Sequence, residues 1–217
     1  MSFCMAISDV DWQLTKDVFS IAGTIASVFG VGLAFYIGLV GLSTWKRQLR
    51  GAADHKLARD AATAIYKYKT ALVLLWGYAS SAAMHTNDEN WIASMGEDSY
   101  SRSIYQPHID KAEQARADLE PIAIECAAIF GGVFVEGFQK LYQFESKCAS
   151  CIHNYLYLMS RVGYDEQAIE VSEDSIKAWA KFAANGIDSI ESSKVFIEKL
   201  ISPMLNELEK RLLKDIQ

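Results

Sequence analysis

Residues 18–45 form a run without a single charged side chain, and this feature restricts the fold more than any other. A helix needs about 20 apolar residues to cross a bilayer core about 30 Å thick, and the run is long enough to cross with some tilt. A core helix of a soluble protein rarely stays uncharged on every face over such a length. The sequence therefore predicts a transmembrane helix over residues 18–42.

A cleaved signal peptide is the alternative interpretation of an apolar segment near the N-terminus. Signal peptides begin with basic residues and continue into a shorter apolar stretch. Here Asp9, Asp11 and Asp17 precede the apolar run, against the single basic residue Lys16. We therefore expect a retained anchor.

The flanks of the apolar run predict its orientation, because lysine and arginine are retained on the cytoplasmic side of a membrane. Lys16 is the only basic side chain before the run. Five basic side chains follow it within 14 positions, namely Lys46, Arg47, Arg50, Lys56 and Arg59. The predicted membrane-interface residues are Trp45, Lys46, Arg47 and Arg50. We expect residues 1–17 outside the cytoplasm and the bulk of the chain inside. The basic cluster either sets the topology alone or also binds anionic headgroups of the lipid bilayer.

One stripe of the predicted span consists of small residues at four-residue steps. Its members are Ala22, Ala26, Gly30, Ala34 and Gly38. Small residues at this spacing let two helix backbones approach closely, so that packing drives association in the membrane. The other interpretation is a segment simply rich in small residues. We expect a homo-oligomer that forms through this stripe.

The rest of the chain predicts helices, and the expected fold class is all-α: one transmembrane helix followed by an antiparallel helical bundle. Residues 43–84 predict a juxtamembrane helix or coiled-coil segment that continues into the bundle, because apolar residues recur at three- and four-residue steps. These residues are Leu57, Ala61, Ala64, Tyr68, Leu72, Leu75 and Ala79. Residues 85–103 predict a loop pinned by Trp91, Ile92 and Met95, and residues 104–217 predict the cytoplasmic bundle.

Within the bundle, local signals predict where the helices begin and end. Pro107 is expected in a first helical turn, Pro121 at a kink or restart, and Gly131–Gly132 at a break. A turn is expected over residues 161–171, followed by Ser172 as the N-cap of a helix. That helix is expected to bury a stripe and to kink or restart at Pro203. The stripe comprises Ile176, Trp179, Ala183, Ile187, Ile190, Ile197 and Ile201.

Candidate chemistry is sparse. Cys148 and Cys151 form a CxxC pair, but a tetrahedral metal site needs further ligands at matched spacing, and the pair lies on an apolar helical stripe, where free cysteine usually packs as a small hydrophobe. Glu125 and Glu136 interrupt apolar stretches and are expected either to pair with a basic residue or to point to water. No phosphate loop or hydrolase motif occurs. We expect no catalytic residue, metal or cofactor, and the net charge of −6 argues against nucleic acid as a partner.

The segment Trp45-Lys-Arg-Gln-Leu-Arg-Gly51, followed by His55, Leu57 and Arg59, resembles a juxtamembrane motif. The motif recurs in bacterial single-pass membrane proteins of uncharacterised function that pair one N-terminal span with a cytoplasmic helical domain. The resemblance implies the bacterial inner membrane as the location and implies no activity.

These expectations lead to a non-enzymatic, membrane-anchored interaction or sensing module that self-associates through its span and recruits an unknown cytoplasmic protein. The alternative is a membrane-disrupting or pore-forming effector of a stress or phage-defence system, although the span has no polar face to line water. An enzyme with an unrecognised site is the third possibility.

Overall fold

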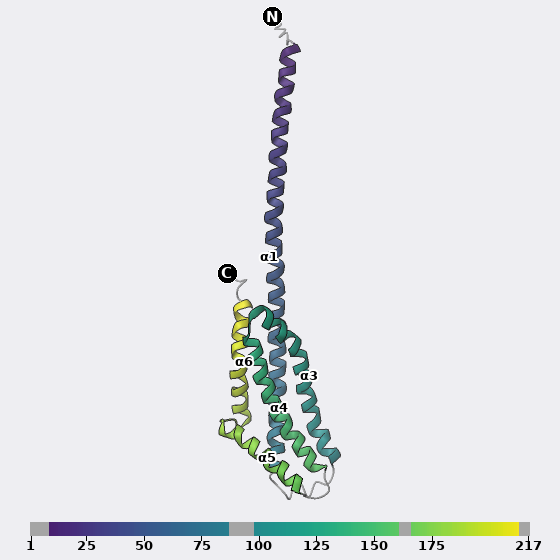
Figure 1. Cartoon of the computed structure of the whole chain (residues 1–217), viewed down its shortest axis with the longest axis vertical. Helices are drawn as coiled ribbons and strands as arrows, with labels where there is room; N and C mark the ends of the chain where they lie inside the picture. Colours follow the sequence, from purple (N-terminus) through teal and green to yellow (C-terminus); the bar gives the residue numbers. More distant parts are fainter. Residues whose placement is uncertain (1–8, 87–97, 161–165, 213–217) are drawn as a thin grey trace. The chain divides into compact units, whose positions relative to one another are not determined.

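The computed structural model describes residues 9–86, 98–160 and 166–212, and these residues form helices and short connections without a strand. Figure 1 shows the helices, which are α1 (Asp9–Thr86), α3 (Asp98–Phe130), α4 (Val133–Met159), α5 (Glu166–Ala184) and α6 (Ile190–Leu212). The predicted all-α class is confirmed for this part of the chain. The chain divides into two compact units, Met1–Ala53 and Asp54–Gln217.

The first unit contains the N-terminal part of α1. Every described side chain from residue 12 to residue 50 is exposed, and large apolar ones such as Phe29 and Val31 are at least 70% exposed. Within the described residues, α1 is the one helix that is long and apolar enough to cross a membrane. The uncharged run predicted as a span is therefore helical, and its side chains are exposed.

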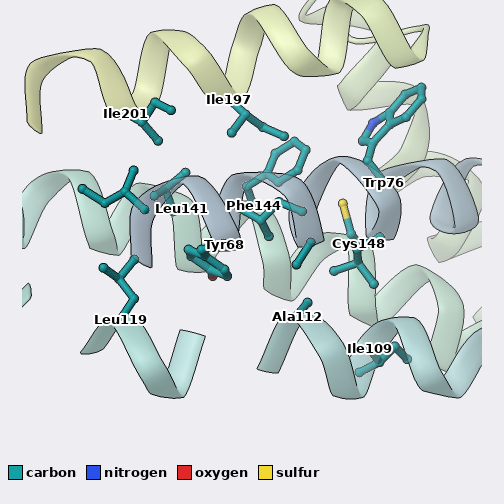
Figure 2. Close-up of a cluster of buried hydrophobic side chains, with 14 of the residues drawn as sticks. Tyr68, Trp76, Ile109, Ala112, Leu119, Leu141, Phe144, Cys148, Ile197 and Ile201 are labelled. Carbon is teal, nitrogen blue, oxygen red and sulfur yellow. The ribbon is translucent and has the colours of Figure 1, made fainter. Parts of the chain in front are cut away.

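The second unit is built around α4, which packs against α3, α5 and α6 and also contacts α1. Figure 2 shows part of its buried core, in which side chains from α1, α3, α4 and α6 meet. The largest fully buried side chains include Tyr68, Trp76, Ile109, Leu119, Leu141 and Ile197. The core is thus shared among helices distant in the sequence.

The part of α1 in this unit is amphipathic, as the sequence predicted. Each of the apolar residues named for its stripe, from Leu57 to Ala79, is buried. Tyr66, Thr63 and Thr70 lie on the exposed side. Side chains that recur at steps of three and four share one helix face, so burying that face against α3 and α4 explains why the helix persists here.

The break after α3 agrees with the glycine signal, whereas a restart at Pro121 and a first-turn position for Pro107 are not found. Gly131 follows the end of α3 with φ +107°, a conformation that favours glycine. In contrast, α3 continues through Pro121 without a restart, and Pro107 lies well inside the helix rather than in its first turn. Both prolines are exposed, so water can hydrate the carbonyl groups that lose a backbone donor.

Both ends of the predicted loop over residues 85–103 are helical, because α1 extends to Thr86 and α3 begins at Asp98. Trp91, Ile92 and Met95 lie outside the described residues, so their predicted pinning role stays a prediction.

The single helix expected after Ser172 is two helices. A hydrogen-bond pattern typical of a helix C-terminus ends α5: Ile187 N–H donates to Phe182 O and Gly186 N–H donates to Ala183 O, each at 2.9 Å. Gly186 has φ +75°. The two helices follow one another along α4, whose Phe144 contacts both Phe182 of α5 and Phe196 of α6.

The apolar stripe predicted across these two helices is only partly buried. Ile187, Ile197 and Ile201 are buried, whereas Ile176, Ala183 and Ile190 are exposed. Ser189 begins α6 with a reciprocal cap, since Ser192 N–H donates to Ser189 Oγ at 3.2 Å and Ser189 N–H donates to Ser192 Oγ at 2.9 Å.

The prediction that Ser172 caps a helix N-terminus was wrong. Ser172 lies inside α5, is buried, and donates its hydroxyl to Thr86 O at 3.4 Å. The last carbonyl groups of a helix have no partner within the helix. Ser172 therefore supplies a hydrogen-bond donor to the last carbonyl group of α1, a helix that ends 86 positions earlier in the chain.

Two glycines inside helices are expected to respond oppositely to alanine. A Cβ at Gly137 would lie 2.6 Å from Met204 Sδ, whereas one at Gly77 would meet nothing within 4 Å. Overpacking a core costs about 1–3 kcal/mol, and replacing helical glycine by alanine gains up to about 1 kcal/mol. Chemical denaturation should show Gly137→Ala lowering the free energy of unfolding by about 1 kcal/mol and Gly77→Ala raising it by about 0.5 kcal/mol. Equal stabilisation by both substitutions would contradict the close contact between α4 and α6.

Candidate functional site

The residues predicted for self-association and for the membrane interface all lie on the first unit. The stripe comprises Ala22, Ala26, Gly30, Ala34 and Gly38, and each of them is exposed. A Cβ added at Gly30 or Gly38 would meet nothing within 4 Å. The predicted interface residues Trp45, Lys46, Arg47 and Arg50 are exposed as well. This stripe is thus a bare surface in the single chain.

Two hydroxyl groups near the middle of the apolar segment are satisfied within the helix. Thr24 Oγ1 donates to Ser20 O, and Ser27 Oγ donates to Gly23 O, each at 2.9 Å. An unsatisfied polar group in hydrocarbon costs several kcal/mol. These side chains therefore require neither water nor a partner helix to pair them.

A buried polar cluster joins α1, α3 and α4 in the second unit. Glu145 of α4 is 3% exposed. Its Oε2 accepts a hydrogen bond from the Tyr68 hydroxyl of α1, and its Oε1 lies 3.3 Å from Arg116 Nε of α3. The Arg116 guanidinium lies 4.9 Å from the centre of the Tyr142 ring, a cation–π distance. The cluster thus ties three helices together through one carboxylate.

The electrostatics of this cluster are set mainly by burial. Burial raises the pKa of Glu145 above its ordinary value, while the Tyr68 hydrogen bond and Arg116 act in the opposite direction. Burial and the Glu145 carboxylate also raise the pKa of Tyr68, so this hydroxyl remains a donor at all physiological pH values. The cluster holds one carboxylate whose charged form is disfavoured in the folded protein.

The two acids that interrupt apolar stretches behave as the sequence predicted, one pointing to water and one pairing with a basic residue. Glu125 is exposed, and Glu136, with its side chain 77% exposed, forms a surface ion pair with Lys140 at 3.8 Å. The buried acid, Glu145, was missed. A signal for it exists in the sequence, because Glu145 follows the buried Leu141 by four positions and precedes Cys148 by three.

The CxxC pair lies in the core. Cys148 and Cys151 are buried free thiols, and Cys151 Sγ lies 3.5 Å from Ala79 O of α1. Burial raises the pKa of Cys151 to about 12 and that of Cys148 well above its usual range. Thiolate is the form that binds metals and attacks electrophiles. Among the described residues, no group of three or more histidine, cysteine or acidic side chains is placed to hold a metal ion.

An open groove of about 690 Å³ lies between α4, α5 and α6. Its apolar surface comes from Phe144 of α4, Trp179 and Phe182 of α5, and Phe196 and Leu200 of α6. Trp179 and Phe182 lie 5.2 Å apart between ring centres. The bend between α5 and α6 contributes Asn185 and Ile187, so the groove exists only because the predicted single helix is broken there.

The polar lining of this groove is basic and hydrogen-bonding. Its charged members are Lys140, Lys147, Lys181 and Lys199, and its uncharged polar members are Gln143, Ser146, Ser150, Asn154, Ser175 and Asn185. None of the described residues that line the groove is acidic. This groove is not predictable from the sequence, because its residues come from separate helices whose alignment is a tertiary property.

The arrangement as a whole offers an exposed apolar helix face in one unit and a concave basic surface in the other. Comparison of the chain with protein-family models, with curated proteins and with solved structures found no match.

Proposed function

We propose that this protein is a membrane-anchored helical interaction or sensing module that is held in a bacterial inner membrane by residues 18–42 and self-associates there. The observation that carries the proposal is the wholly exposed, uncharged part of α1. In water, burying side chains of this size would contribute about 1.5–3 kcal/mol each. Lipid tails supply that environment without a protein partner.

The basic flank supports a topology with the second unit in the cytoplasm. Lys46, Arg47 and Arg50 follow the apolar run directly and are exposed. Short basic flanks remain on the cytoplasmic side. The resemblance of residues 45–59 to juxtamembrane segments of bacterial single-pass proteins supports the same location.

Contacts within the second unit support an antiparallel helical bundle as the binding module. Tyr105 early in α3 lies beside Tyr155 late in α4, while Phe130 at the end of α3 lies beside Phe134 at the start of α4. These contacts run in opposite chain directions, as neighbouring helices of an up-and-down bundle do. Such a scaffold, through which a cytoplasmic protein could be recruited, needs no catalytic group.

The stripe from Ala22 to Gly38 is proposed as the self-association face. In a Cys4→Ser background, in which the remaining cysteines are buried, a cysteine introduced at Ala26 or Gly30 should form cross-linked dimers on mild oxidation in native membranes. Matched cysteines at Val28 or Tyr36, two positions along from the stripe, should cross-link much less, because residues two apart point to different sides of a helix. The measurement is the dimer fraction on a non-reducing gel.

Three results would contradict parts of this proposal. Recovery of the full chain in the supernatant after ultracentrifugation of lysed cells without detergent would show that residues 18–42 do not anchor the protein. A monomeric mass in detergent, together with the absence of cross-links at every position, would show that the protein does not self-associate. Equal cross-linking at all four positions would indicate random collision rather than a specific helix face.

A further inference from the structure

We propose that the groove between α4, α5 and α6 is a binding site for a small organic phosphate with a flat or apolar portion. The inference deepens the proposed sensing role and rests on it for its biological meaning, but its evidence comes entirely from the second unit. The groove has about 690 Å³ of space, which falls within the range of small-ligand pockets.

The charge of the groove is opposite to that of the protein. The chain has 27 acidic and 21 basic residues, yet four lysines and no acidic residue appear among the described lining residues. Lysines placed together repel one another unless an anion neutralises them. The local excess of positive charge therefore selects an anionic ligand over a neutral or cationic one.

Three of the four lysines are available to such a ligand. Lys140 pairs with Glu136 at 3.8 Å, whereas Lys147, Lys181 and Lys199 form no ion pair within the residues that the structure describes. The Lys147 ammonium lies 5.9 Å from the centre of the Phe182 ring, which places a free cation beside an aromatic surface. A phosphate group accepts several charge-assisted hydrogen bonds from ammonium donors.

The apolar side of the groove suits a ring or a short hydrocarbon portion. Trp179 is partly exposed and lies 5.7 Å from the buried Trp76 ring, which supports it from behind. A supported, partly exposed indole is a rigid surface on which a flat ligand ring can stack. Asn154 and Ser175 line the groove and hydrogen-bond to each other at 2.7 Å, so polar groups adjoin the aromatic surface.

Two sources supply this ligand chemistry: soluble nucleotides and phospholipid headgroups. The test uses the full chain in non-ionic detergent, with tryptophan fluorescence as the readout. ATP and inorganic pyrophosphate form the soluble arm, and phosphatidic acid added to the micelles forms the lipid arm. We expect saturable binding in one arm. Lys147→Gln combined with Lys181→Gln should weaken that binding at least about tenfold, which corresponds to about 1.4 kcal/mol.

The matched control combines Lys67→Gln with Lys111→Gln, which removes the same charge from exposed positions on α1 and α3. This control should leave the affinity within about twofold, because surface charges far from a site act only through screened fields. Trp179→Leu, measured by isothermal titration calorimetry because this variant lacks the reporter indole, should weaken ATP binding more than pyrophosphate binding, since only ATP carries a ring. Circular dichroism should confirm that each variant is folded.

Saturable binding confined to the phosphatidic acid arm assigns the site to a lipid headgroup, and binding confined to ATP assigns it to a nucleotide. The proposal is overturned if no probe binds saturably, or if the control pair weakens binding as much as the groove pair does. Membrane extraction of the same variants tests the anchor separately. A wrong assignment of the groove can therefore be distinguished from a wrong assignment of the anchor.

Discussion

Replacing Glu145 by leucine is expected to lower the free energy of unfolding by about 3 kcal/mol. Leucine fits the space approximately but removes the acceptor of the buried Tyr68 hydroxyl and the partner of Arg116. A buried donor left unsatisfied costs about 1–3 kcal/mol, and breaking a buried ion pair from one side costs about 3–5 kcal/mol. We take the lower end because the Arg116 side chain is 29% exposed and water can partly solvate it.

Glu145→Gln is expected to cost less than Glu145→Leu at neutral pH, because it loses the ion pair with Arg116 but keeps an acceptor for Tyr68. Its amide oxygen can still accept the Tyr68 hydrogen bond. Because the pKa of Glu145 is raised in the folded state, the charged carboxylate is the disfavoured form, and a neutral isostere avoids its desolvation. Chemical denaturation of both variants in the same detergent measures this contrast.

The pH dependence of the free energy of unfolding should also show that the charged form of Glu145 is disfavoured in the folded protein. When the pKa of Glu145 is higher in the folded state than in the unfolded state, the folded protein binds the proton more tightly. The stability that this proton contributes is fully present below the unfolded pKa and is lost as pH rises through the folded pKa. Lowering pH from 7 towards 4.5, the ordinary glutamate value, should therefore stabilise the wild type relative to Glu145→Gln. An opposite slope would mean that Arg116 dominates over burial.

The matched control for both variants is Glu136, an acid on the same helix with a 77% exposed side chain. Glu136→Leu and Glu136→Gln should change the free energy of unfolding by less than about 0.5 kcal/mol, as surface substitutions usually do. A similar loss for Glu136→Leu and Glu145→Leu would show that the buried cluster does not stabilise the fold.

Introducing two aspartates into the apolar run should release the protein from the membrane. Val28→Asp combined with Phe35→Asp places charges near the middle of residues 18–42. Each aspartate at the centre of a spanning helix costs about 2.5–3.5 kcal/mol, so together they disfavour insertion by about 6 kcal/mol. We expect the variant to shift from the membrane pellet to the soluble or aggregated fraction, as measured by fractionation with and without detergent.

Two control variants separate charge from position. Val28→Leu combined with Phe35→Leu keeps the run apolar and should remain in the membrane. Thr63→Asp combined with Ala117→Asp adds the same charge at exposed positions of the second unit and should also remain. Unchanged membrane association of the Val28→Asp, Phe35→Asp variant would show that another part of the chain provides the attachment.

Local sequence signals were sufficient for features that depend on neighbours along the chain. The uncharged run 18–45 predicted a long apolar helix, and the three- and four-residue spacing from Leu57 to Ala79 predicted the buried face of α1. Gly131–Gly132 predicted the break between α3 and α4. A weaker local signal was overlooked at Asn185–Gly186, where glycine accommodates the positive φ that ends α5.

Only the tertiary structure decided which side chains meet. Ser172 has the residue type of an N-cap, yet it satisfies the carbonyl of Thr86 because α5 packs beside the end of α1. Glu145 finds Tyr68 and Arg116 on two other helices, and the lysines of the groove come from α4, α5 and α6. Periodicity records which face of a helix is buried, but not which distant helix covers it, because that choice depends on packing across the whole core.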